Sequence, residues 1–403
     1  MTVECDILIV GGGMTGAALA LALGDLPVKV MVIEARSPEG EGANEDDRSL
    51  TLSPSSRRLF EALGVWPALA ECGPMAIHEI HISDSGPFSG TVHLEARDLG
   101  VEALGYVFEN RALSRTLLEA LSGKDRLTWL APASIMGYDD RGSHLVVRAN
   151  HGGETLEIHC RLLVGSDGTS SRVRELAGIP ARTNDYGQTA LVARFTPEFP
   201  APMIAFERFT PSGPLAVLPR SGGRCGLVLS VSTQEAERLN ASAPAVRALA
   251  EHRFGSRLGR FQALDAPRSF PLRRVMATSV TAPRVTLIGN AAHTLHPVAA
   301  QGLNLGLRDV ATLAELLEQG SDDPGAPSLL QEYVKRRRND VVATSVLTHS
   351  LVRLFSNCVP GLGLARRMGL ALTDALPGIK AGLALRTMGL AGRLPPLLRG
   401  GSL

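Results

Sequence analysis

Three glycines near the start of the chain constrain its fold more than any other feature. An apolar run at residues 5–10 leads directly into Gly11, Gly13 and Gly16, at the spacing G-x-G-x-x-G, and a helix-favouring stretch follows at 17–23. In this order of strand, tight turn and helix, Gly11 permits the turn, Gly13 lets the backbone approach a pyrophosphate, and Gly16 lets the helix pack on the strand. The motif predicts a dinucleotide at the N-terminus of the first helix.

An acidic residue at a suitable distance strengthens this prediction. A second apolar run at 28–33 ends in Glu34, 18 residues after Gly16. At this place a carboxylate accepts hydrogen bonds from an adenosine ribose. The alternative is an ordinary β-α-β unit with a surface glutamate, because glycines near a strand also occur in plain turns.

Composition argues against several other classes of protein. The chain has 403 residues and a formal net charge of +1, without a basic run interleaved with aromatic residues, so we expect no nucleic-acid partner. Five scattered cysteines without a C-x-x-C pair argue against a disulfide framework and predict a reducing, cytoplasmic location. No apolar run reaches about 18 residues, so we expect no membrane-spanning segment. A site at the periphery of the inner membrane is a second expectation for its location.

The pattern of strands and helices predicts an α/β protein with two interleaved domains. Strands expected at 127–130, 134–138, 144–149 and 156–158 form a meander laid across the first unit, and a buried strand follows at 161–166. We expect a Rossmann-like dinucleotide-binding domain at 1–74, 102–180 and 275–341, an antiparallel-sheet substrate domain at 75–101 and 181–274, and a helical region at 342–403.

A second motif, GSDGTSSRVR at 165–174, follows the end of an expected strand. Asp167 and Gly168 form a tight turn there. Asp167 accepts hydrogen bonds either from the N–H groups of the turn or from a ligand hydroxyl, and Arg174 either pairs with a phosphate or braces the turn. An Asp-Gly pair alone is usually only a turn, but its position in a nucleotide-binding fold favours a role in binding.

A third motif, GNAAHTLHPVAAQGLNLGLRD at 289–309, is the densest. Asn290 offers an amide at a strand end where a polyol chain would pass, and Pro297 stiffens the loop. Gln301 and Gly302 open the next helix, whose N-terminal amides can bind an electron-rich ring edge.

Two histidines, His293 and His296, lie in the loop of this third motif. We interpret them as structural residues that satisfy backbone carbonyls, with a catalytic base or a ligand as the alternative. No other His, Cys or carboxylate stands at metal-ligand spacing near them, so we expect no metal.

Together the three motifs resemble the class A flavin-dependent aromatic monooxygenases, and in particular the hydroxylases of ubiquinone biosynthesis. The similarity covers nearly the whole chain, in a motif order and spacing specific to the class. Residues 206–219, FERFTPSGPLAVLP, look most like the subgroup that hydroxylates 2-polyprenyl-6-methoxyphenol. The resemblance implies FAD in a p-hydroxybenzoate hydroxylase-like fold.

The resemblance also implies a reaction. NAD(P)H reduces FAD, O2 adds at the flavin C4a, and the resulting hydroperoxide transfers oxygen to a polyprenylated phenol. Two alternatives stay open: a flavin enzyme of the same fold with another task, such as an epoxidase or a prenyl reductase, and a noncatalytic scaffold in a quinone-synthesis complex. A complex with other ubiquinone-biosynthesis proteins is equally open for an active enzyme.

The family pattern further implies a set of cofactor-binding residues that spans all three motifs: Gly11, Gly13, Gly16, Glu34, Arg48, Arg111, Asp167, Gly168, Asn290, Gln301, Gly302 and Asn304. The first four would hold the ADP half of FAD, and the two arginines would lie against the flavin or its pyrophosphate. Asp167 and Gly168 match a second nucleotide motif, associated with the FAD pyrophosphate and with NAD(P)H. Pro297, Gln301 and Gly302 would line the isoalloxazine, which makes Pro297 and Gln301 catalytic candidates.

Two residues depart from the family pattern. Asn290 stands where the family usually has aspartate, so the ribityl contact would be a neutral amide, as in the methoxyphenol subgroup. Ala300 stands where many members have glycine, which narrows the room beside the flavin.

Glu207 and Arg208 are the remaining catalytic candidates. On a strand over the flavin they could orient a phenol or assist its deprotonation. The alternative is a solvent-exposed or cross-strand ion pair.

The C-terminal region differs in charge from the rest of the chain. From residue 342 onward it has seven basic residues and one acidic residue, a net charge of +6. Leucines at 347, 351 and 354 fall at helical spacing, so we expect an amphipathic helix. A basic, apolar region suits an anionic membrane surface or an acidic partner, and it would help an enzyme whose substrate carries an isoprenoid tail. The alternative is a helical extension packed on the FAD domain.

Overall fold

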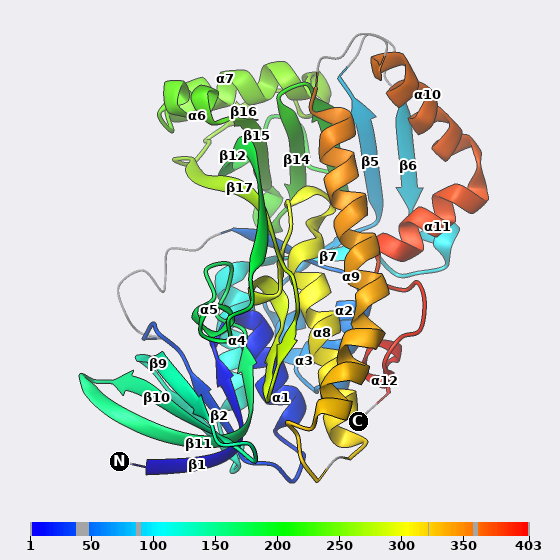
Figure 1. Ribbon diagram of the computed structural model, residues 1–403. Coiled ribbons are helices and arrows are strands. Elements are labelled where there is room, and N and C mark those ends of the chain that lie inside the picture. Colours follow the sequence, from blue (N-terminus) through cyan, green and yellow to red (C-terminus); the bar gives the residue numbers. More distant parts are fainter. Residues whose placement is uncertain (1, 38–47, 86–89, 321, 358–361, 402–403) are drawn as a thin grey trace.

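Two large sheets and one small sheet, covered by helices, make up the fold (Figure 1). The computed structural model describes residues 2–37, 48–85, 90–320, 322–357 and 362–401. The chain passes between the two large sheets more than once, so the expected α/β class with an interleaved antiparallel sheet is confirmed.

The first sheet is built around the strand that precedes the glycine motif. β1 (Thr2–Val10) pairs in parallel with β11 (Glu154–Gly165) and β2 (Val30–Ile33), and β19 (Val285–Leu287) and β8 (Leu127–Leu130) extend the parallel order on the two sides. These strands are nearly continuous apolar runs because both faces of the sheet are buried. The remaining strands of this sheet are β9 (Ala133–Asp140), β10 (Leu145–His151) and β18 (Thr281–Ala282).

The expected meander is only partly right. Residues 127–130 pair in parallel with β2 and so belong to the main sheet. The two strands expected at 156–158 and 161–166 are one strand, β11, which pairs with antiparallel β10 on one side and parallel β1 on the other. Polar side chains interrupt the apolar pattern of β11, but the strand continues because both its edges are paired.

The second sheet is antiparallel except where β13 meets β5. Helices α6 and α7 cover its outer face, and aromatic and aliphatic side chains fill the space between them (Figure 1). Its strands, in spatial order, are β20 (His293–Thr294), β17 (Arg268–Ala277), β12 (Ala181–Pro197), β15 (Cys225–Ser232), β14 (Gly213–Pro219), β13 (Ile204–Thr210), β5 (Glu79–Asp84) and β6 (Thr91–Glu95), with β16 (Phe261–Gln262) paired to β12.

The strands of the small sheet alternate along the chain with strands of the two large sheets. It consists of β3 (Ser49–Leu52), β7 (Gly105–Glu109) and β4 (Met75–Ile77), all antiparallel. The helices that precede the C-terminal region are α1 (Met14–Leu23), α2 (Pro54–Ala62), α3 (Trp66–Glu71), α4 (Asn110–Leu121), α5 (Arg172–Leu176), α6 (Thr233–Leu239), α7 (Ala243–Phe254) and α8 (Gln301–Glu318).

A 29-residue helix, α9 (Pro327–Phe355), runs along both large sheets (Figure 1). Near its start, the Tyr333 hydroxyl donates to the carbonyl oxygen of Leu287 at 3.3 Å in the first sheet. At its end, the Phe355 ring stacks on Phe209 of β13, with ring centroids 4.1 Å apart. The helix therefore ties the two sheets together.

Three further helices complete the C-terminal region: α10 (Leu362–Ala375), α11 (Pro377–Thr387) and α12 (Pro396–Arg399). Buried residues of α10 and α11 pack on β5 and β6, so this region covers the second sheet as well as the dinucleotide-binding side. Among the described residues, no single helix is long and apolar enough to cross a bilayer; α10 and α11 pass that test only together, bent by 94°.

Candidate functional site

The ends of four parallel strands meet at one edge of the first sheet and bring the three motifs together. The register pairs Val10 with Ile33 and with Gly165, and Gly165 with Leu287. Beyond these strand ends lie, in turn, the glycine motif, Glu34, the Asp-Gly turn and the third motif. This edge, at the carboxyl ends of the strands, is where open α/β sheets bind their ligands.

Glycine stands at each position of the first motif for a different structural reason. Gly11 has a φ of +99°, and a Cβ there would lie 2.6 Å from the carbonyl oxygen of Ser166. A Cβ on Gly16 would lie 2.0 Å from the carbonyl oxygen of Gly11, so the helix can approach the strand only with glycine at this position. A Cβ on Gly13 would meet nothing within 4 Å, and no side chain caps α1. The N–H groups of the first turn therefore face open space that suits a pyrophosphate.

Glu34 lies beside this helix N-terminus. Its Oε2 accepts a hydrogen bond from the N–H of Gly12 at 2.6 Å, and its Oε1 accepts one from the N–H of Arg36 at 2.9 Å. The side chain is partly exposed, so its oxygens retain room for a ribose hydroxyl.

Asp167 and Arg174 of the Asp-Gly motif both bond within the protein. The carboxylate of Asp167 accepts from the N–H groups of Arg172 at 2.6 Å and Val173 at 3.0 Å, and from the Ser171 hydroxyl. It thus caps α5. Arg174 donates to the carbonyl oxygens of Ala291 at 2.8 Å and Thr169 at 2.9 Å and so braces the turn. Gly168, with a φ of +82° and open space at its Cβ position, leaves the turn accessible.

Asp309, which the sequence analysis did not single out, fixes the third motif to the sheet. Its carboxylate accepts from the N–H of Gly289 at 3.0 Å and contacts His293 Nε2 at 2.6 Å and Arg337 Nε at 2.7 Å. Burial acts to raise the pKa of Asp309, but His293 and Arg337 outweigh it and lower the pKa to about 2. The signal that could have revealed this cluster is the occurrence of two adjacent charged residues, Arg and Asp, in the otherwise apolar sequence of α8.

The two histidines of the third motif bond within the protein, but not to the expected backbone carbonyls. His293 contacts the carboxylate of Asp309, and Nδ1 of His296 accepts a hydrogen bond from the N–H of Val298 at 3.1 Å. Burial lowers the pKa of His296 to about 3, so its ring is neutral. No group of three His, Cys, Asp or Glu side chains within the described part of the chain could hold a metal.

Asn290 is exposed at the edge where the strand ends meet, next to Gly289. Gly289 has a φ of +57°, and a Cβ there would lie 3.0 Å from the Thr15 side chain of α1. The third motif is therefore packed directly on the first, and the exposed Asn290 is the next residue along the chain.

The loop before α8 has a strained backbone. Ala299 and Ala300 have φ values of 58° and 50°, in the left-handed region that glycine favours. Pro297 is exposed, a Cβ on Gly302 would meet nothing within 4 Å, and no side chain caps α8. Such strain clusters at functional sites, and the open N-terminus of α8 can accept an electron-rich ring edge.

Two candidate side chains in this segment are engaged elsewhere. Nε2 of Gln301 donates to the carbonyl oxygens of Ala299 at 2.9 Å and Thr387 at 3.0 Å. The amide of Asn304 makes four hydrogen bonds, to the backbone of Thr51, Ser53 and Ala300 and to the Ser56 hydroxyl. Asn304 therefore has no hydrogen-bonding group left for a ligand, and Gln301 is buried.

Arg48 and Arg111 are exposed and lie close together where β3 meets the start of α4. The carbonyl oxygen of Arg48 accepts from the N–H of Asn110 at 3.0 Å, and its guanidinium lies 4.8 Å from the centroid of the Phe270 ring in the second sheet. Arg48 therefore faces the junction between the sheets.

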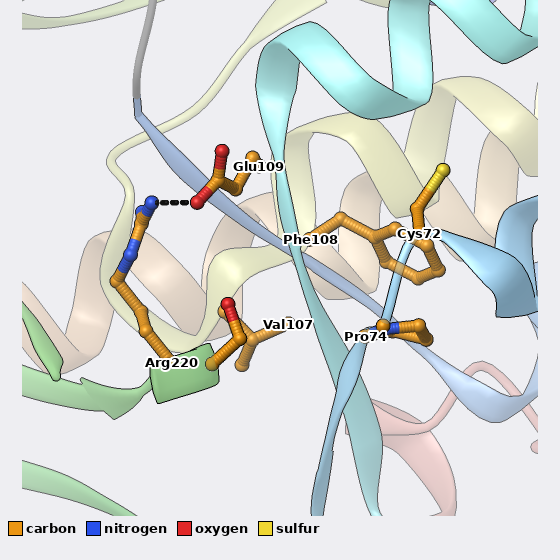
Figure 2. Close-up of a pocket in the computed structure, with 8 residues that line it drawn as sticks. Cys72, Pro74, Val107, Phe108, Glu109 and Arg220 are labelled. Atoms are coloured by element: carbon orange, nitrogen blue, oxygen red, sulfur yellow. Dashed lines mark hydrogen bonds and ion pairs between the residues drawn. The ribbon is translucent and has the colours of Figure 1, made fainter. Parts of the chain in front are cut away.

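Arg220, another residue that the sequence analysis missed, joins the second sheet to the small one. Its guanidinium is buried and donates to Glu109 at 2.5 Å (Figure 2). It also donates to the Ser49 hydroxyl at 2.7 Å. Cys72, Pro74 and other neighbours line a cavity of about 20 Å³ beside this pair, which is room for a water molecule and not for a substrate.

Glu207 and Arg208 do not pair with each other, because they point to opposite faces of β13. Nε of Arg208 donates to the carbonyl oxygen of Arg253 in α7, at 2.8 Å, on the outer face. Glu207 lies on the inner face between Ala205 and Phe209, whose side chains belong to the cluster that contains Val298. Its side chain is mostly buried and no described residue bonds to it; burial raises the pKa of Glu207 to about 7.

Comparisons with known proteins agree with these features. The family model described as FAD binding domain matches residues 4–349. The chain is 38% identical to the ubiquinone hydroxylase UbiL of Rhodospirillum rubrum, covering 98% of this chain and 92% of that protein, and 33% identical to the 3-demethoxyubiquinol 3-hydroxylase of Escherichia coli, covering 92% and 94%. The solved structure of p-nitrophenol 4-monooxygenase PnpA from Pseudomonas putida shares the fold, with a TM-score of 0.80 at 18% identity over 97% and 99% of the two chains. This chain therefore belongs to the FAD-binding family of flavin-dependent hydroxylases that includes the ubiquinone hydroxylases, as its motifs predict.

Proposed function

We propose that this protein is an FAD-dependent monooxygenase that hydroxylates a polyprenylated phenol in ubiquinone biosynthesis, with NAD(P)H and O2 as co-substrates. The observation that carries the proposal is the meeting of all three motifs at one sheet edge, beside the uncapped N-terminus of α1. Relatives that cover nearly the whole chain are named as hydroxylases of ubiquinone and its precursors, which supports the substrate class. The methoxyphenol subgroup, and contact with other proteins of ubiquinone synthesis, stay predictions.

The residues at this edge suit FAD. In the proposed site the backbone of Gly11 and Gly13 holds the pyrophosphate, Glu34 binds the adenosine ribose, and Asn290 binds the ribityl chain. Pro297 and Gly302 border the isoalloxazine at the N-terminus of α8, with Arg48 and Arg111 at the junction between the sheets. When bound, the cofactor supplies reduction, oxygen activation and oxygen transfer, while the protein supplies position and a water-poor pocket.

The division of the chain follows from this assignment. FAD binding belongs to 1–74, 102–180 and 275–341, and the substrate ring to 75–101 and 181–274, with 342–403 as a helical cover. Strands β5 and β6, from the first of the two substrate segments, support this division because they join the second sheet.

Glu207 is the proposed base for the phenol. Its carboxylate lies on the face of β13 that is directed towards the loop at 297–300, and no cation among the residues that the structure describes stabilises its charge. A carboxylate with a pKa near 7 can accept the proton of a phenol hydroxyl and so make the ring more electron-rich. Arg208, on the opposite face, takes no part in this step.

The test is direct. The purified protein should show a flavin absorption spectrum, and a prenylated phenol should stimulate NAD(P)H oxidation and yield a ring hydroxylated with oxygen from labelled O2. Oxygen on the prenyl chain would instead support an epoxidase, and a reduced chain a prenyl reductase. A protein that takes up no FAD, or that holds FAD without phenol-stimulated oxidation, would be a scaffold and would refute the proposal.

A further inference from the structure

A groove of about 900 Å³ lies between α9 and the paired strands β12 and β17. The pairing sets Asn184 opposite Arg274, and Arg182 opposite Met276, so these four side chains share one face of the two strands. That face meets α9, because Nε of Arg274 donates to the Ser345 hydroxyl at 2.8 Å. The walls of the groove are therefore regular elements that are bonded to each other.

Three arginines, one from each of these elements, line the groove. They are Arg182 of β12, Arg274 of β17 and Arg338 of α9, and we call the space that they border the arginine groove. None of the described residues that line it is acidic. Arg182 and Arg338 are exposed, and their guanidinium groups bond to no described residue. Like charges that line one groove repel one another, and a bound anion offsets that repulsion.

The acidic residues on the same elements are paired with other cations. On β12, the carboxylate of Asp185 accepts from Nε of Arg273 at 3.1 Å. On α9, the carboxylate of Asp340 accepts from Nη1 of Arg337 at 2.6 Å and from Nε of Arg308 at 2.8 Å. These carboxylates therefore leave the charge of the arginine groove available for a ligand.

The shape and chemistry of the arginine groove suit a nucleotide with more than one phosphate. Guanidinium groups match the oxygens of a phosphate with two parallel hydrogen bonds. The volume is that of a site for a whole small molecule and is far more than a single phosphate ion fills. Met276 and the 53% exposed Val342 add apolar surface for a base, and Thr278 adds a hydroxyl.

Strand β17 connects the arginine groove to the third motif. Met276, which lines the groove, pairs with His293 of β20, and the N–H of Ala277 donates to the carbonyl oxygen of Ala292 at 2.9 Å. The Thr294 hydroxyl in turn contacts the Thr169 hydroxyl of the second motif at 2.9 Å. Paired strands are about 5 Å apart. An extended dinucleotide is several times longer than this spacing, so it can place its phosphates in the groove and its nicotinamide near the third motif.

We propose that the arginine groove binds the phosphates of the nicotinamide co-substrate and favours NADPH over NADH. This inference rests on the proposed function, which requires NAD(P)H without distinguishing the two forms. Both forms carry a pyrophosphate, and NADPH adds a 2′-phosphate with a charge of about −1.5 to −2. Three arginines complement this larger charge better than that of the pyrophosphate alone, as an arginine does at other NADP sites.

Calorimetric titration of the FAD-loaded protein measures this binding apart from turnover. The probes are NADP⁺, NAD⁺ and inorganic phosphate, none of which can donate a hydride. The wild type should bind NADP⁺ at least about tenfold more tightly than NAD⁺. Arg182→Gln and Arg338→Gln should each weaken the binding of NADP⁺ about tenfold, because each loses a charge-assisted hydrogen bond. Their Tm should stay that of the wild type, since neither side chain bonds to a described residue.

Arg238→Gln is the matched control for both variants. Arg238 is also exposed and bonds to no described residue, but it lies on α6, which covers the outer face of the second sheet (Figure 1). This variant should bind NADP⁺ as the wild type does. Reduction of the bound FAD in the absence of O2 gives a second readout. The NADPH concentration that gives the half-maximal rate should rise about tenfold in Arg338→Gln, while dithionite still reduces the flavin fully.

The possible results separate this proposal from the proposed function. The groove assignment would be overturned if the wild type bound NAD⁺ as tightly as NADP⁺, or if both arginine variants bound NADP⁺ as Arg238→Gln does. Inorganic phosphate that bound as tightly as NADP⁺ would show a free-phosphate site and would also overturn it. Tight NADP⁺ binding that depends on both arginines, without any hydroxylated phenol, would support the groove and refute only the proposed function. Phenol hydroxylation that used NADH and NADPH equally and was unaffected by the variants would do the reverse.

Discussion

Replacement of Glu207 by glutamine should stabilise the protein at alkaline pH and have little effect at acid pH. Burial raises the pKa of Glu207 from 4.5 to about 7, so the folded state holds this proton more tightly than the unfolded chain. The wild type therefore loses stability as the pH rises from 4.5 through 7. One pKa unit is worth about 1.4 kcal/mol, so the full loss is about 3 kcal/mol. Glutamine cannot ionise, so the variant avoids this loss of stability.

Thermal unfolding of the FAD-loaded protein measures this effect. At an unfolding entropy of about 2.1 cal/mol/K per residue, 3 kcal/mol corresponds to a Tm about 3–4 °C higher for the variant at about pH 8.5, and to no difference at about pH 4.5. Glu154→Gln, at an exposed strand position, is the control and should show no such pH dependence. The Glu207→Gln variant should also lose the rise in kcat through pH 7, and its kcat should fall about 10²-fold or more, because the base is gone. An equal Tm for variant and wild type at alkaline pH would mean that the carboxylate is solvated or paired, and the assignment of Glu207 as a base would fail.

Three further predictions follow from the backbone and the buried charges. Gly13→Ala should fold normally but take up FAD poorly, whereas Gly16→Ala should lower the Tm, because only its Cβ collides with backbone; equal Tm values would contradict this. Asp309→Asn should cost about 3 kcal/mol in urea unfolding, since it leaves Arg337 buried beside a neutral amide, and a loss below about 1 kcal/mol would show that Asp340 suffices as a partner. Ala300→Gly should stabilise the protein by about 0.5–1 kcal/mol by relieving its positive φ, and a lower Tm would refute that source of strain.

The parts of the site that the sequence predicted well are those encoded by local spacing. Gly11, Gly13 and Gly16 have fixed positions relative to one strand and one helix, so their spacing already defines the turn. Glu34 follows from the next strand end. The register of the parallel sheet then places these motifs beside the Asp-Gly turn, because parallel strands end at a common edge.

The parts that could not be predicted depend on contacts between distant elements. Asp309 and Arg337 lie on separate helices, 28 residues apart, and nothing local in the sequence pairs them. Neighbouring residues of a strand face opposite ways, but only the packing of α7 shows that Arg208, and not Glu207, is on the outer side. Likewise, only the positions of its neighbours show that the hydrogen-bonding groups of Asn304 are already occupied.

The long helix α9 limits how this molecule can move. This continuous helix is held by Arg337 to the half of the molecule that contains the first sheet, and by Phe355 to the half that contains the second sheet. A hinge motion between the halves would have to bend the helix or break those contacts. Substrate entry and product release must then rely on short-range rearrangements, such as shifts of the 297–300 segment, and we expect the two halves to keep one relative orientation throughout turnover.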